Sequence, residues 1–405
     1  MGRPSAVDGL HATGCVALTG GDPDWGDLVD GGQVVAGEVS GDQHAAGVAR
    51  ELRASGAPFA LTGVGGEMMR EAGVELIEHA EKLAHLGFVE PLKHLPQYLR
   101  LRRELRTRIE SGRVALVVLI DYGGFNMKVA AVAADAGVPV LYYITPQVWA
   151  SRAGRMKKLA RTVTRAAVIL PFEEKLLRDN GIDATFVGHP LLDRAQALPD
   201  RADARQAMGI GPDEKLLALF PGSRAQEIAR HLGPFVATAR ELQRRDPALK
   251  VVVSAAPHVT IPAERCPFPL AHAASFSLLR AADAAMCKSG TTTIEATVAL
   301  CPMVVAYRTD WLTYALARHL LTIPFIGLVN VVAGREVARE FVQDALDPIA
   351  VADALEPLLD TASPARAAMI AELARVRDML GEPGAAKRVA AIAMSLASAS
   401  GERAS

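Results

Sequence analysis

The stretch Asp283-Ala-Ala-Met-Cys-Lys-Ser-Gly-Thr-Thr-Thr-Ile-Glu-Ala-Thr-Val-Ala-Leu-Cys-Pro-Met-Val-Val-Ala-Tyr307 holds the pattern that decides the fold. An apolar run enters a small polar loop at 288–293, a helical segment bearing Glu295 follows, and Pro302 opens a second apolar run. A strand, a Ser/Gly/Thr turn and a helix aim the unpaired amides of the helix N-terminus at an anion. Because Glu295 lies close to that loop, the stretch predicts phosphate binding beside a carboxylate that grips a sugar hydroxyl, as in a nucleotide-sugar site.

The same alternation of strand, loop and helix extends along most of the chain. Residues 114–120 are nearly all aliphatic, as expected of a strand that is buried on both faces of a parallel sheet. Strands that alternate with helices predict a doubly wound α/β sheet. The expected strands cover residues 33–36, 59–62, 114–120, 138–144, 166–170, 215–220, 250–255, 284–287 and 303–306.

A length of 405 residues allows two domains with sizeable cores. We expect two Rossmann-like domains that face each other across a cleft. The expected segments are a disordered extension at 1–31, an N-terminal domain at 32–190, a linker at 191–204, a C-terminal domain at 205–375, and a C-terminal helix and tail at 376–405.

Composition narrows the classes of function. Half of the residues are apolar and the net charge is −1, which excludes a nucleic-acid binder that relies on bulk charge. No stretch reaches the roughly 18 apolar residues of a membrane span, and residues 1–31 do not have the pattern of a signal peptide. The four cysteines have no metal-ligand spacing, and a reducing cytoplasm is expected.

Ligands of doubly wound sheets bind beyond the carboxyl ends of the strands, so the loops that follow strands are the candidates for chemistry. The loop at 221–224 offers Gly222 for close backbone approach, Ser223 as a helix cap and Arg224 as a fork for phosphate. A capped turn with a solvated arginine is the alternative.

Two acidic loops in the first half are the other candidates. Asp121 ends the most hydrophobic strand, where a desolvated carboxylate suits a general base, although an N-cap or Asx-turn is the competing role. The loop with Glu38, Ser40 and Asp42 favours polar grip on a sugar or acceptor over phosphate binding. Its alternative is an Asp-capped helix start.

Residues 82–106 interleave apolar and basic side chains. Such a segment can lie in a membrane interface, and an ordinary core helix with a solvated basic face is the alternative. The apolar positions singled out for acceptor or membrane contact are Leu86, Phe88, Val89, Leu92, Leu95 and Leu99.

Taken together, these loops resemble the lipid-A-disaccharide synthases, which are membrane-associated glycosyltransferases. The resemblance runs from about residue 33 to residue 344, with every motif in order. It rests on Ala36-Gly-Glu-Val-Ser-Gly-Asp42, Gly63-Val-Gly-Gly66, Leu86-Gly-Phe-Val-Glu90, Ile120-Asp-Tyr-Gly-Gly-Phe-Asn126, Pro146-Gln-Val-Trp-Ala150, Leu170-Pro-Phe-Glu173, Val187-Gly-His-Pro190, Phe220-Pro-Gly-Ser-Arg224, Ser289-Gly-Thr-Thr-Thr-Ile-Glu295, Pro302-Met-Val-Val-Ala-Tyr307 and Asn330-Val-Val-Ala-Gly-Arg-Glu336.

The resemblance implies a GT-B fold, no metal and no cofactor. It implies an inverting transfer that joins UDP-2,3-diacylglucosamine to 2,3-diacylglucosamine 1-phosphate, giving lipid A disaccharide 1-phosphate and UDP. Inversion needs a base for the acceptor hydroxyl. Asp121 is the first choice and Glu38 the second, while Arg224 is expected to balance the charge on the departing UDP.

The resemblance also assigns the two domains. The first is expected to face the acceptor and the membrane, and the second to bind the UDP-sugar. The residues expected to bind the UDP-sugar are Ser223, Arg224, Lys288, Ser289, Gly290, Thr291, Glu295, Asn330, Arg335 and Glu336. The implied partners are the UDP-sugar, an acylated glucosamine phosphate, lipid at the cytoplasmic face of the inner membrane, and a second copy of the chain in a homodimer.

Three positions depart from the family pattern. Gly124 stands where many members carry a second acid, Val329 where a proline precedes the asparagine, and Lys288 where a small apolar residue is common. Two other functions compete with the leading hypothesis. One is another GT-B enzyme acting on a UDP-sugar, such as a 2-epimerase, and the other is a non-catalytic lipid-binding protein of the envelope.

Overall fold

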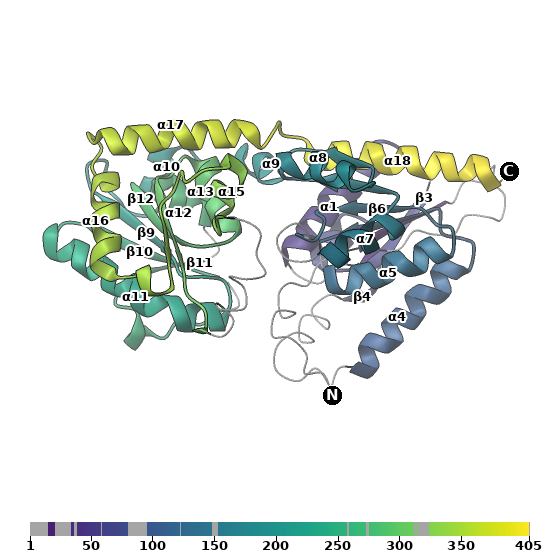
Figure 1. Ribbon diagram of the computed structural model, residues 1–405, viewed down its shortest axis with the longest axis horizontal. Helices are drawn as coiled ribbons and strands as arrows, with labels where there is room; N and C mark the ends of the chain where they lie inside the picture. The colour runs from purple at the N-terminus through teal and green to yellow at the C-terminus, as the bar shows by residue number, and fades with distance from the viewer. Residues whose placement is uncertain are drawn as a thin grey trace. The chain divides into compact units, whose positions relative to one another are not determined.

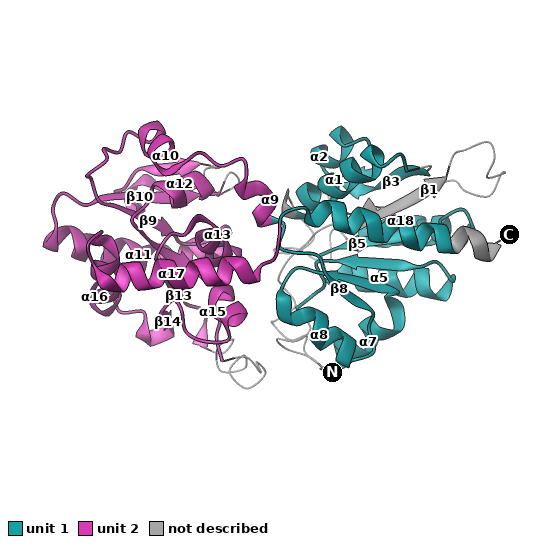
Figure 2. Ribbon diagram, turned by 90° about the horizontal axis from the view of Figure 1, so that it is seen from above, with its two compact units in different colours: residues 1–190, 383–405 teal, residues 191–382 magenta. Residues whose placement is uncertain are grey.

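The computed structural model describes residues 15–20, 34–35, 39–57, 59–79, 95–121, 123–147, 153–256, 259–272, 275–311, 314 and 324–404. The chain divides into two compact units (Figure 2). Unit 1 contains residues 1–190 and 383–405, and unit 2 contains residues 191–382. Both are α/β, as predicted from the alternation of apolar runs and helices.

Unit 1 is built on an eight-stranded sheet in the order β4-β3-β2-β1-β5-β6-β7-β8. The first strand runs antiparallel to β2, β3 and β5, and the remaining paired strands are parallel. The strands are β1 (Cys15–Gly20), β2 (Val34–Val35), β3 (Phe59–Gly65), β4 (Glu75–His79), β5 (Leu116–Ile120), β6 (Val140–Tyr143), β7 (Arg165–Val168) and β8 (Ala184–Phe186).

Helices cover both faces of this sheet (Figure 1). Alternate residues of β5 enter two different cores, with Val117 and Leu119 in one and Val118 and Ile120 in the other. Helices α4 (Leu95–Glu110), α5 (Gly123–Asp135), α7 (Ala153–Thr162) and α8 (Pro171–Asp179) contribute to the first core, and α1 (Val39–Ala54), α2 (Glu67–Glu71) and α18 (Ala385–Ala404) to the second. This burial on both faces explains the all-aliphatic sequence of β5.

Unit 2 has a six-stranded parallel sheet in the order β11-β10-β9-β12-β13-β14. Counted within the unit, this is the 3-2-1-4-5-6 order of a dinucleotide-binding sheet, and the order reverses between β9 and β12. The strands are β9 (Leu216–Phe220), β10 (Lys250–Ala255), β11 (Leu270–His272), β12 (Ala284–Lys288), β13 (Met303–Tyr307) and β14 (Glu340–Val342).

The helices of unit 2 also form two layers. Buried residues of α11 (Ala225–Arg245) and α16 (Pro348–Leu359) pack together with Leu217 and Leu219 of β9 in one core. Helices α12 (Ser275–Ala281) and α13 (Thr291–Ala299) contact β9 and β12, respectively. The other elements are α9 (Leu191–Ala195), α10 (Arg201–Ala207), the 3-10 turns η2 (Ala263–Arg265) and η3 (Gln343–Ala345), α15 (Leu328–Ala333) and α17 (Pro364–Met379).

Several expected boundaries differ from the structure. Residues 15–20, expected within a disordered extension, form β1, because this apolar segment pairs with three strands. Residues 1–14 and 21–31 lie outside the described part of the chain. The expected C-terminal segment at 376–405 is divided between the units, since α17 ends in unit 2 and α18 lies in unit 1. Val389, Ala390 and Ala393 of α18 are buried in the second core of unit 1.

The expected linker at 191–204 is part of the packed structure of unit 2. It contains α9 and the first turn of α10. Arg201 forms an ion pair of 2.6 Å with the buried carboxylate of Asp283, and Arg205 approaches the same carboxylate at 3.4 Å. The contact of Arg201, and that of Arg205 just beyond the segment, therefore fix it to the residue before β12, which lies 82 positions after Arg201.

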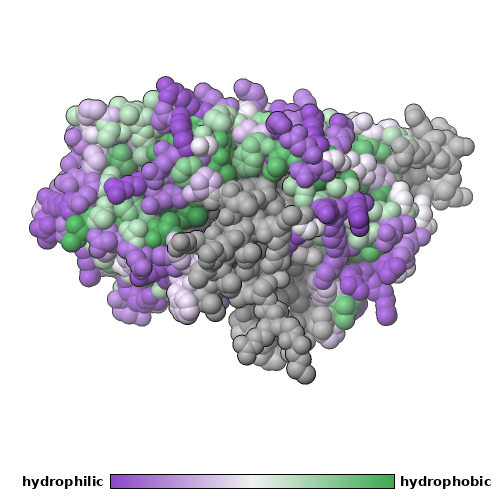
Figure 3. All heavy atoms as spheres, viewed as in Figure 1, coloured by the Kyte–Doolittle hydropathy of each residue, from purple (hydrophilic) through white to green (hydrophobic). Residues whose placement is uncertain are grey.

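No helix in the described part of the chain is long and apolar enough to cross a membrane. On the face shown in Figure 3, hydrophilic and hydrophobic residues are interspersed over the coloured atoms of both units.

Candidate functional site

The strand order of unit 2 places two of the predicted loops side by side. The loop at 221–224 follows β9, and the loop at 289–290 follows β12, the neighbouring strand across the reversal. Ligands of such sheets bind beyond the carboxyl ends of the strands at this point. We call these two loops the carboxyl edge of unit 2.

Gly222 has a φ of +132°, a conformation that favours glycine. A Cβ atom on this residue would lie 2.5 Å from Cβ of Glu227 and 2.7 Å from its Oε2. The first turn of α11 therefore packs directly against the loop, and no larger residue fits there.

Glu227 is the electrostatic centre of this edge. Its Oε1 lies 2.8 Å from Nζ of Lys288 and 3.1 Å from Nη1 of Arg224, and its Oε2 accepts the backbone N–H of Ser223 at 2.9 Å. The side chains of Lys288, Glu227 and Arg224 are 17%, 13% and 18% exposed. Burial opposes ionisation of Glu227, but Lys288, the Ser223 amide and Arg224 outweigh it and lower its pKa to about 2.

His231 ties the same helix to the end of β13. Its Nδ1 lies 2.7 Å from the carbonyl oxygen of Glu227, and its Nε2 accepts the backbone N–H of Arg308 at 2.8 Å. Since Nε2 accepts a hydrogen bond, Nδ1 must carry the proton of the neutral ring. Burial lowers the pKa of His231, which favours this neutral form.

The second loop leads into α13. Gly290 has a φ of +147° and is the N-cap, so that helical geometry begins at Thr291. The hydroxyl of Ser289 donates to the carbonyl oxygen of Ile326 at 2.6 Å. The first amides of a helix have no partner within that helix and carry the positive end of its dipole. This end of α13 is therefore suited to an anion.

Glu295 belongs to α13 and has a side chain that is only 12% exposed. Burial raises its pKa, while Arg194 of α9, with Nη1 3.8 Å away, and the hydroxyl of Ser275 lower it. A partly compensated buried carboxylate can accept hydrogen bonds from a ligand's hydroxyl groups. Arg194 is a contributor that the sequence patterns did not identify, because nothing in the local sequence of α9 points to α13.

Asn330, expected near the UDP-sugar, is a fully buried structural residue. Its Nδ2 donates to Glu340 at 2.8 Å and to the carbonyl of Ala338 at 2.7 Å, and its Oδ1 accepts two backbone amides. Glu340 in turn accepts the amide of Ile326, whose carbonyl holds Ser289. Asn330 thus positions the loop beside Ser289 through two intermediate contacts.

Arg335 and Glu336 have other partners. Arg335 pairs with Glu372 of α17, and its side chain is 51% exposed. Glu336 accepts the backbone amide of Glu340 at 3.2 Å. Neither pair includes a residue of the carboxyl edge of unit 2.

In unit 1, Asp121 stands directly after β5 with a φ of +52°. Its carbonyl oxygen accepts the hydroxyl of Tyr142 at 2.6 Å and Nδ2 of Asn126 at 2.9 Å. Ile144, which follows the neighbouring strand β6, has a φ of +58°. Aspartate adopts left-handed geometry more readily than most residues, whereas it is unusual for a β-branched residue such as Ile144, and such strain gathers at functional sites. We call Asp121 and Ile144 the carboxyl edge of unit 1.

Asp42 has a structural role in the described fold. Its carboxylate accepts the backbone amides of Gly66 at 2.8 Å, Met68 at 3.0 Å and Met69 at 3.1 Å. It therefore caps α2, a helix other than the one in which it resides. Glu38 and the side chain of Ser40 lie outside the described residues.

The predicted membrane segment is described only in part. Leu86, Phe88, Val89, Leu92 and the side chain of Leu95 lie outside the described residues. In α4, Leu101, Leu105 and Ile109 are buried, whereas Leu99 is 44% exposed. The inner face of α4 is thus an ordinary core face, and Leu99 lies on the solvent side.

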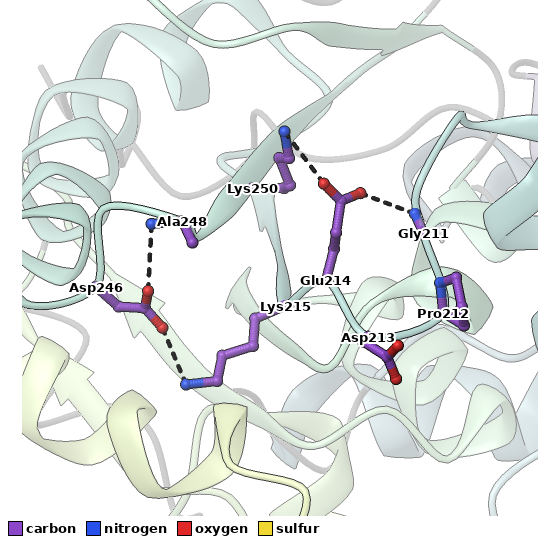
Figure 4. Close-up of a pocket in the computed structure, with 8 residues that line it drawn as sticks. All are labelled: Gly211, Pro212, Asp213, Glu214, Lys215, Asp246, Ala248 and Lys250. Carbon is purple, nitrogen blue, oxygen red and sulfur yellow. Dashed lines mark hydrogen bonds and ion pairs between the residues drawn. The ribbon is translucent and has the colours of Figure 1, made fainter.

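A surface hollow lies at the opposite, amino edge of the sheet of unit 2, around the starts of β9 and β10 (Figure 4). Four of its five charged side chains are paired, with Lys215 2.9 Å from Asp246 and Lys250 3.3 Å from Glu214, and the fifth is Asp213. This edge is not where doubly wound sheets bind ligands. Among the described residues, no group of three or more His, Cys, Asp or Glu side chains is arranged to hold a metal ion.

Comparison with known proteins identifies the family. Residues 33–390 match the family model described as lipid-A-disaccharide synthetase. The lipid-A-disaccharide synthase of Anaeromyxobacter sp. (strain K) is 40% identical over 372 residues, which cover 90% of this chain and 96% of that protein. The chain belongs to the lipid-A-disaccharide synthase family. Its relative in Trichlorobacter lovleyi is 38% identical over 370 residues, covering 90% of this chain and 96% of that protein.

Solved structures with low sequence identity share the fold of this family member. The calicheamicin glycosyltransferase CalG4 matches with a TM-score of 0.55 at 17% identity, covering 89% of this chain and 95% of CalG4. The UDP-GlcNAc 2-epimerase of Neisseria meningitidis, solved bound to UDP-GlcNAc, matches with a TM-score of 0.55 at 11% identity, covering 81% and 88% of the two chains. The α/β GT-B fold class predicted from the sequence is confirmed, and so is the resemblance to lipid-A-disaccharide synthases. The chain is a glycosyltransferase of lipid A disaccharide synthesis.

Proposed function

We propose that this chain transfers 2,3-diacylglucosamine from UDP to the 6-hydroxyl of 2,3-diacylglucosamine 1-phosphate, with inversion at the anomeric carbon. The products are the β(1→6) disaccharide 1-phosphate and UDP. The observation that carries the proposal is that the loop bearing Arg224 and the Ser289–Gly290 loop follow neighbouring strands, β9 and β12, at the strand-order reversal of unit 2, in a chain of this family.

The donor would bind at the carboxyl edge of unit 2. Ser289, Gly290 and Thr291 would present the start of α13 to the diphosphate, with Arg224 as its cation. Glu295 would accept hydrogen bonds from the ribose hydroxyl groups. The epimerase that shares this fold was solved bound to UDP-GlcNAc, which supports a UDP-sugar as the donor here.

Transfer requires a base in unit 1 and stabilisation of the leaving group in unit 2. Asp121 would take the proton of the acceptor 6-hydroxyl as its oxygen attacks the anomeric carbon. The bond from that carbon to the diphosphate breaks, and its electron pair remains on the departing UDP. Arg224 would balance this charge. The position of Asp121 directly after the buried strand β5 supports its role, and Glu38 is the second choice for the base.

Both substrates carry acyl chains, so the enzyme would work at a lipid surface. We expect peripheral binding at the cytoplasmic face of the inner membrane through residues 82–106. The exposed Leu99 supports this, since Arg100, Arg102 and Arg103 beside it are also exposed and suit anionic lipid.

Vesicle binding tests the membrane proposal. Joint replacement of Leu92, Leu95 and Leu99 by serine should release the protein from sedimented anionic vesicles. Met68→Ser, an exposed apolar residue on α2, is the matched control and should leave binding unchanged. Retention of the triple variant on the vesicles would place the interface elsewhere.

Incubation of the purified protein with both diacylglucosamine substrates, followed by mass spectrometry, tests the reaction. The expected result is the disaccharide 1-phosphate together with stoichiometric UDP. The likeness to 2-epimerases makes a different action on UDP-sugars the second candidate. Conversion of the UDP-sugar without an acceptor would favour that candidate and contradict the transferase.

A further inference from the structure

Lys288 is the last residue of β12, and its ammonium lies 2.8 Å from Oε1 of Glu227. The guanidinium of Arg224 approaches the same carboxylate oxygen, Oε1, at 3.1 Å. Two cations thus share one anion at the carboxyl edge of unit 2. The three side chains carry a net charge of +1, and all are largely buried.

We propose that Lys288 is a positioning residue that neutralises Glu227 and thereby keeps the charge of Arg224 available to the diphosphate. This inference rests on the proposed binding of a UDP-sugar at this edge. It replaces the expectation that the lysine ammonium itself binds phosphate.

The loop needs Glu227 for its geometry. The carboxylate holds the amide of Ser223 at 2.9 Å, and the first turn of α11 packs so tightly on Gly222 that no Cβ fits between them. The same carboxylate is unfavourable for an incoming anion. It cannot lose its charge by protonation near neutral pH, because its neighbours hold its pKa at about 2.

A second cation resolves this conflict. Without Lys288, Arg224 and Glu227 would form a neutral pair in a site of low exposure, where a diphosphate is poorly attracted. Lys288 enters from the end of β12 and reaches α11, with Nζ 5.8 Å from the ring centroid of Tyr307. Its ammonium is therefore held on Glu227, 61 residues away in sequence.

A double-mutant cycle on UDP affinity tests the inference. Calorimetry would compare the wild type, Lys288→Met, Glu227→Gln and the double variant. We expect Lys288→Met to weaken UDP binding by about tenfold or more in the wild-type background and by less than about threefold in the Glu227→Gln background. Equal losses in both backgrounds would mean that the ammonium binds the diphosphate directly, and no loss in either would mean that Lys288 is idle. Both results overturn the inference.

If the Glu227→Gln variant does not fold, two further measurements still test the inference. Lys288→Arg keeps the charge and should retain UDP affinity within about threefold of the wild type. In a crystal structure of the UDP complex, Nζ of Lys288 should remain within hydrogen-bond distance of Glu227 and away from every phosphate oxygen. A direct contact between Nζ and phosphate would overturn the inference.

The cycle reads UDP binding and needs neither acceptor nor turnover. A protein that follows the cycle but forms no disaccharide would contradict the proposed transfer and leave the role of Lys288 intact. A protein that forms disaccharide but loses equal UDP affinity in both backgrounds would support the proposed transfer and contradict the role of Lys288. Failure of the wild type to bind UDP would overturn both.

Discussion

The two sheets end in different ways at their carboxyl edges. In unit 2 the loops carry charged side chains that are held in ion pairs around Glu227. In unit 1 the backbone itself is held in left-handed geometry at Asp121 and Ile144. The difference fits the two proposed ligand groups. A diphosphate carries a fixed charge and needs cations already in place, whereas a neutral acceptor hydroxyl needs one carboxylate aimed with precision.

Asp121 offers the largest expected effect. Asp121→Asn should lower the rate of disaccharide formation by roughly 10²-fold or more, because the amide cannot take the acceptor proton. UDP affinity should stay within about twofold, since the substitution is in unit 1. Kinetics and calorimetry on one preparation would check both.

Asp121→Ala is the matched control for the backbone. Alanine tolerates left-handed geometry less well than asparagine, so this variant should also lose about 1 kcal/mol of stability. Near-normal turnover of Asp121→Asn would remove Asp121 as the base and transfer that role to Glu38.

Gly222→Ala addresses the packing of unit 2. The new Cβ would meet Glu227 at 2.5 Å, and the loop would have to move. We expect UDP affinity to fall by about tenfold because the displaced loop carries Arg224, and overpacking should also lower stability by roughly 1–3 kcal/mol.

Gly334→Ala is the control, because this glycine has a φ of +67° but no atom within 4 Å of the Cβ position. It should lose stability and keep its UDP affinity. If both variants bind UDP as the wild type does, the loop at 221–224 is not part of the donor site.

His189 gives the smallest effect, and it concerns stability. Burial, with His44 nearby, lowers the pKa of His189 to about 3 in the folded chain, from 6.5. The folded state therefore stays neutral while the unfolded chain takes up a proton. Stability contributed by His189 is complete above pH 6.5 and declines as the pH falls from 6.5 towards 3, at no more than about 1.4 kcal/mol per pH unit.

Chemical unfolding of unit 1 at pH 7, 6 and 5 checks this. His189→Gln should flatten the decline, and His272→Gln, at an exposed residue of unit 2, should not. An unchanged slope in His189→Gln would show that other groups set the acid sensitivity of unit 1.

Much of the fold could be predicted from the sequence, because strands and helices follow local patterns. The aliphatic run at 114–120, the Ser/Gly/Thr loop and the order of the motifs were enough for the α/β class and the family. These signals are carried by neighbouring residues, so no knowledge of distant contacts is required.

Parts of the site could not be predicted, since they depend on partners far away in sequence. Asp42 has the sequence context of a polar loop residue, but it caps α2, whose N-cap residue Gly66 lies 24 residues later. Asn330 matches a motif expected near the UDP-sugar, but each of its polar atoms is used in holding a loop. Nothing in residues 385–404 indicates that α18 packs in unit 1 against α1.

Lys288 and the loop that follows it at 289–290 separate most clearly what the sequence determines from what the tertiary structure decides. The sequence by itself determined that an apolar strand leads through a Ser/Gly/Thr turn into a helix, because strand, turn and helix signals are local. Only the tertiary structure decided which side chain the lysine meets. The parallel pairing of β9 with β12 brings the loop before α11 beside the end of β12, and Glu227 then meets both Lys288 and Arg224. Side-chain charge is fixed by residue type, whereas its partner is fixed by the order of strands in the sheet.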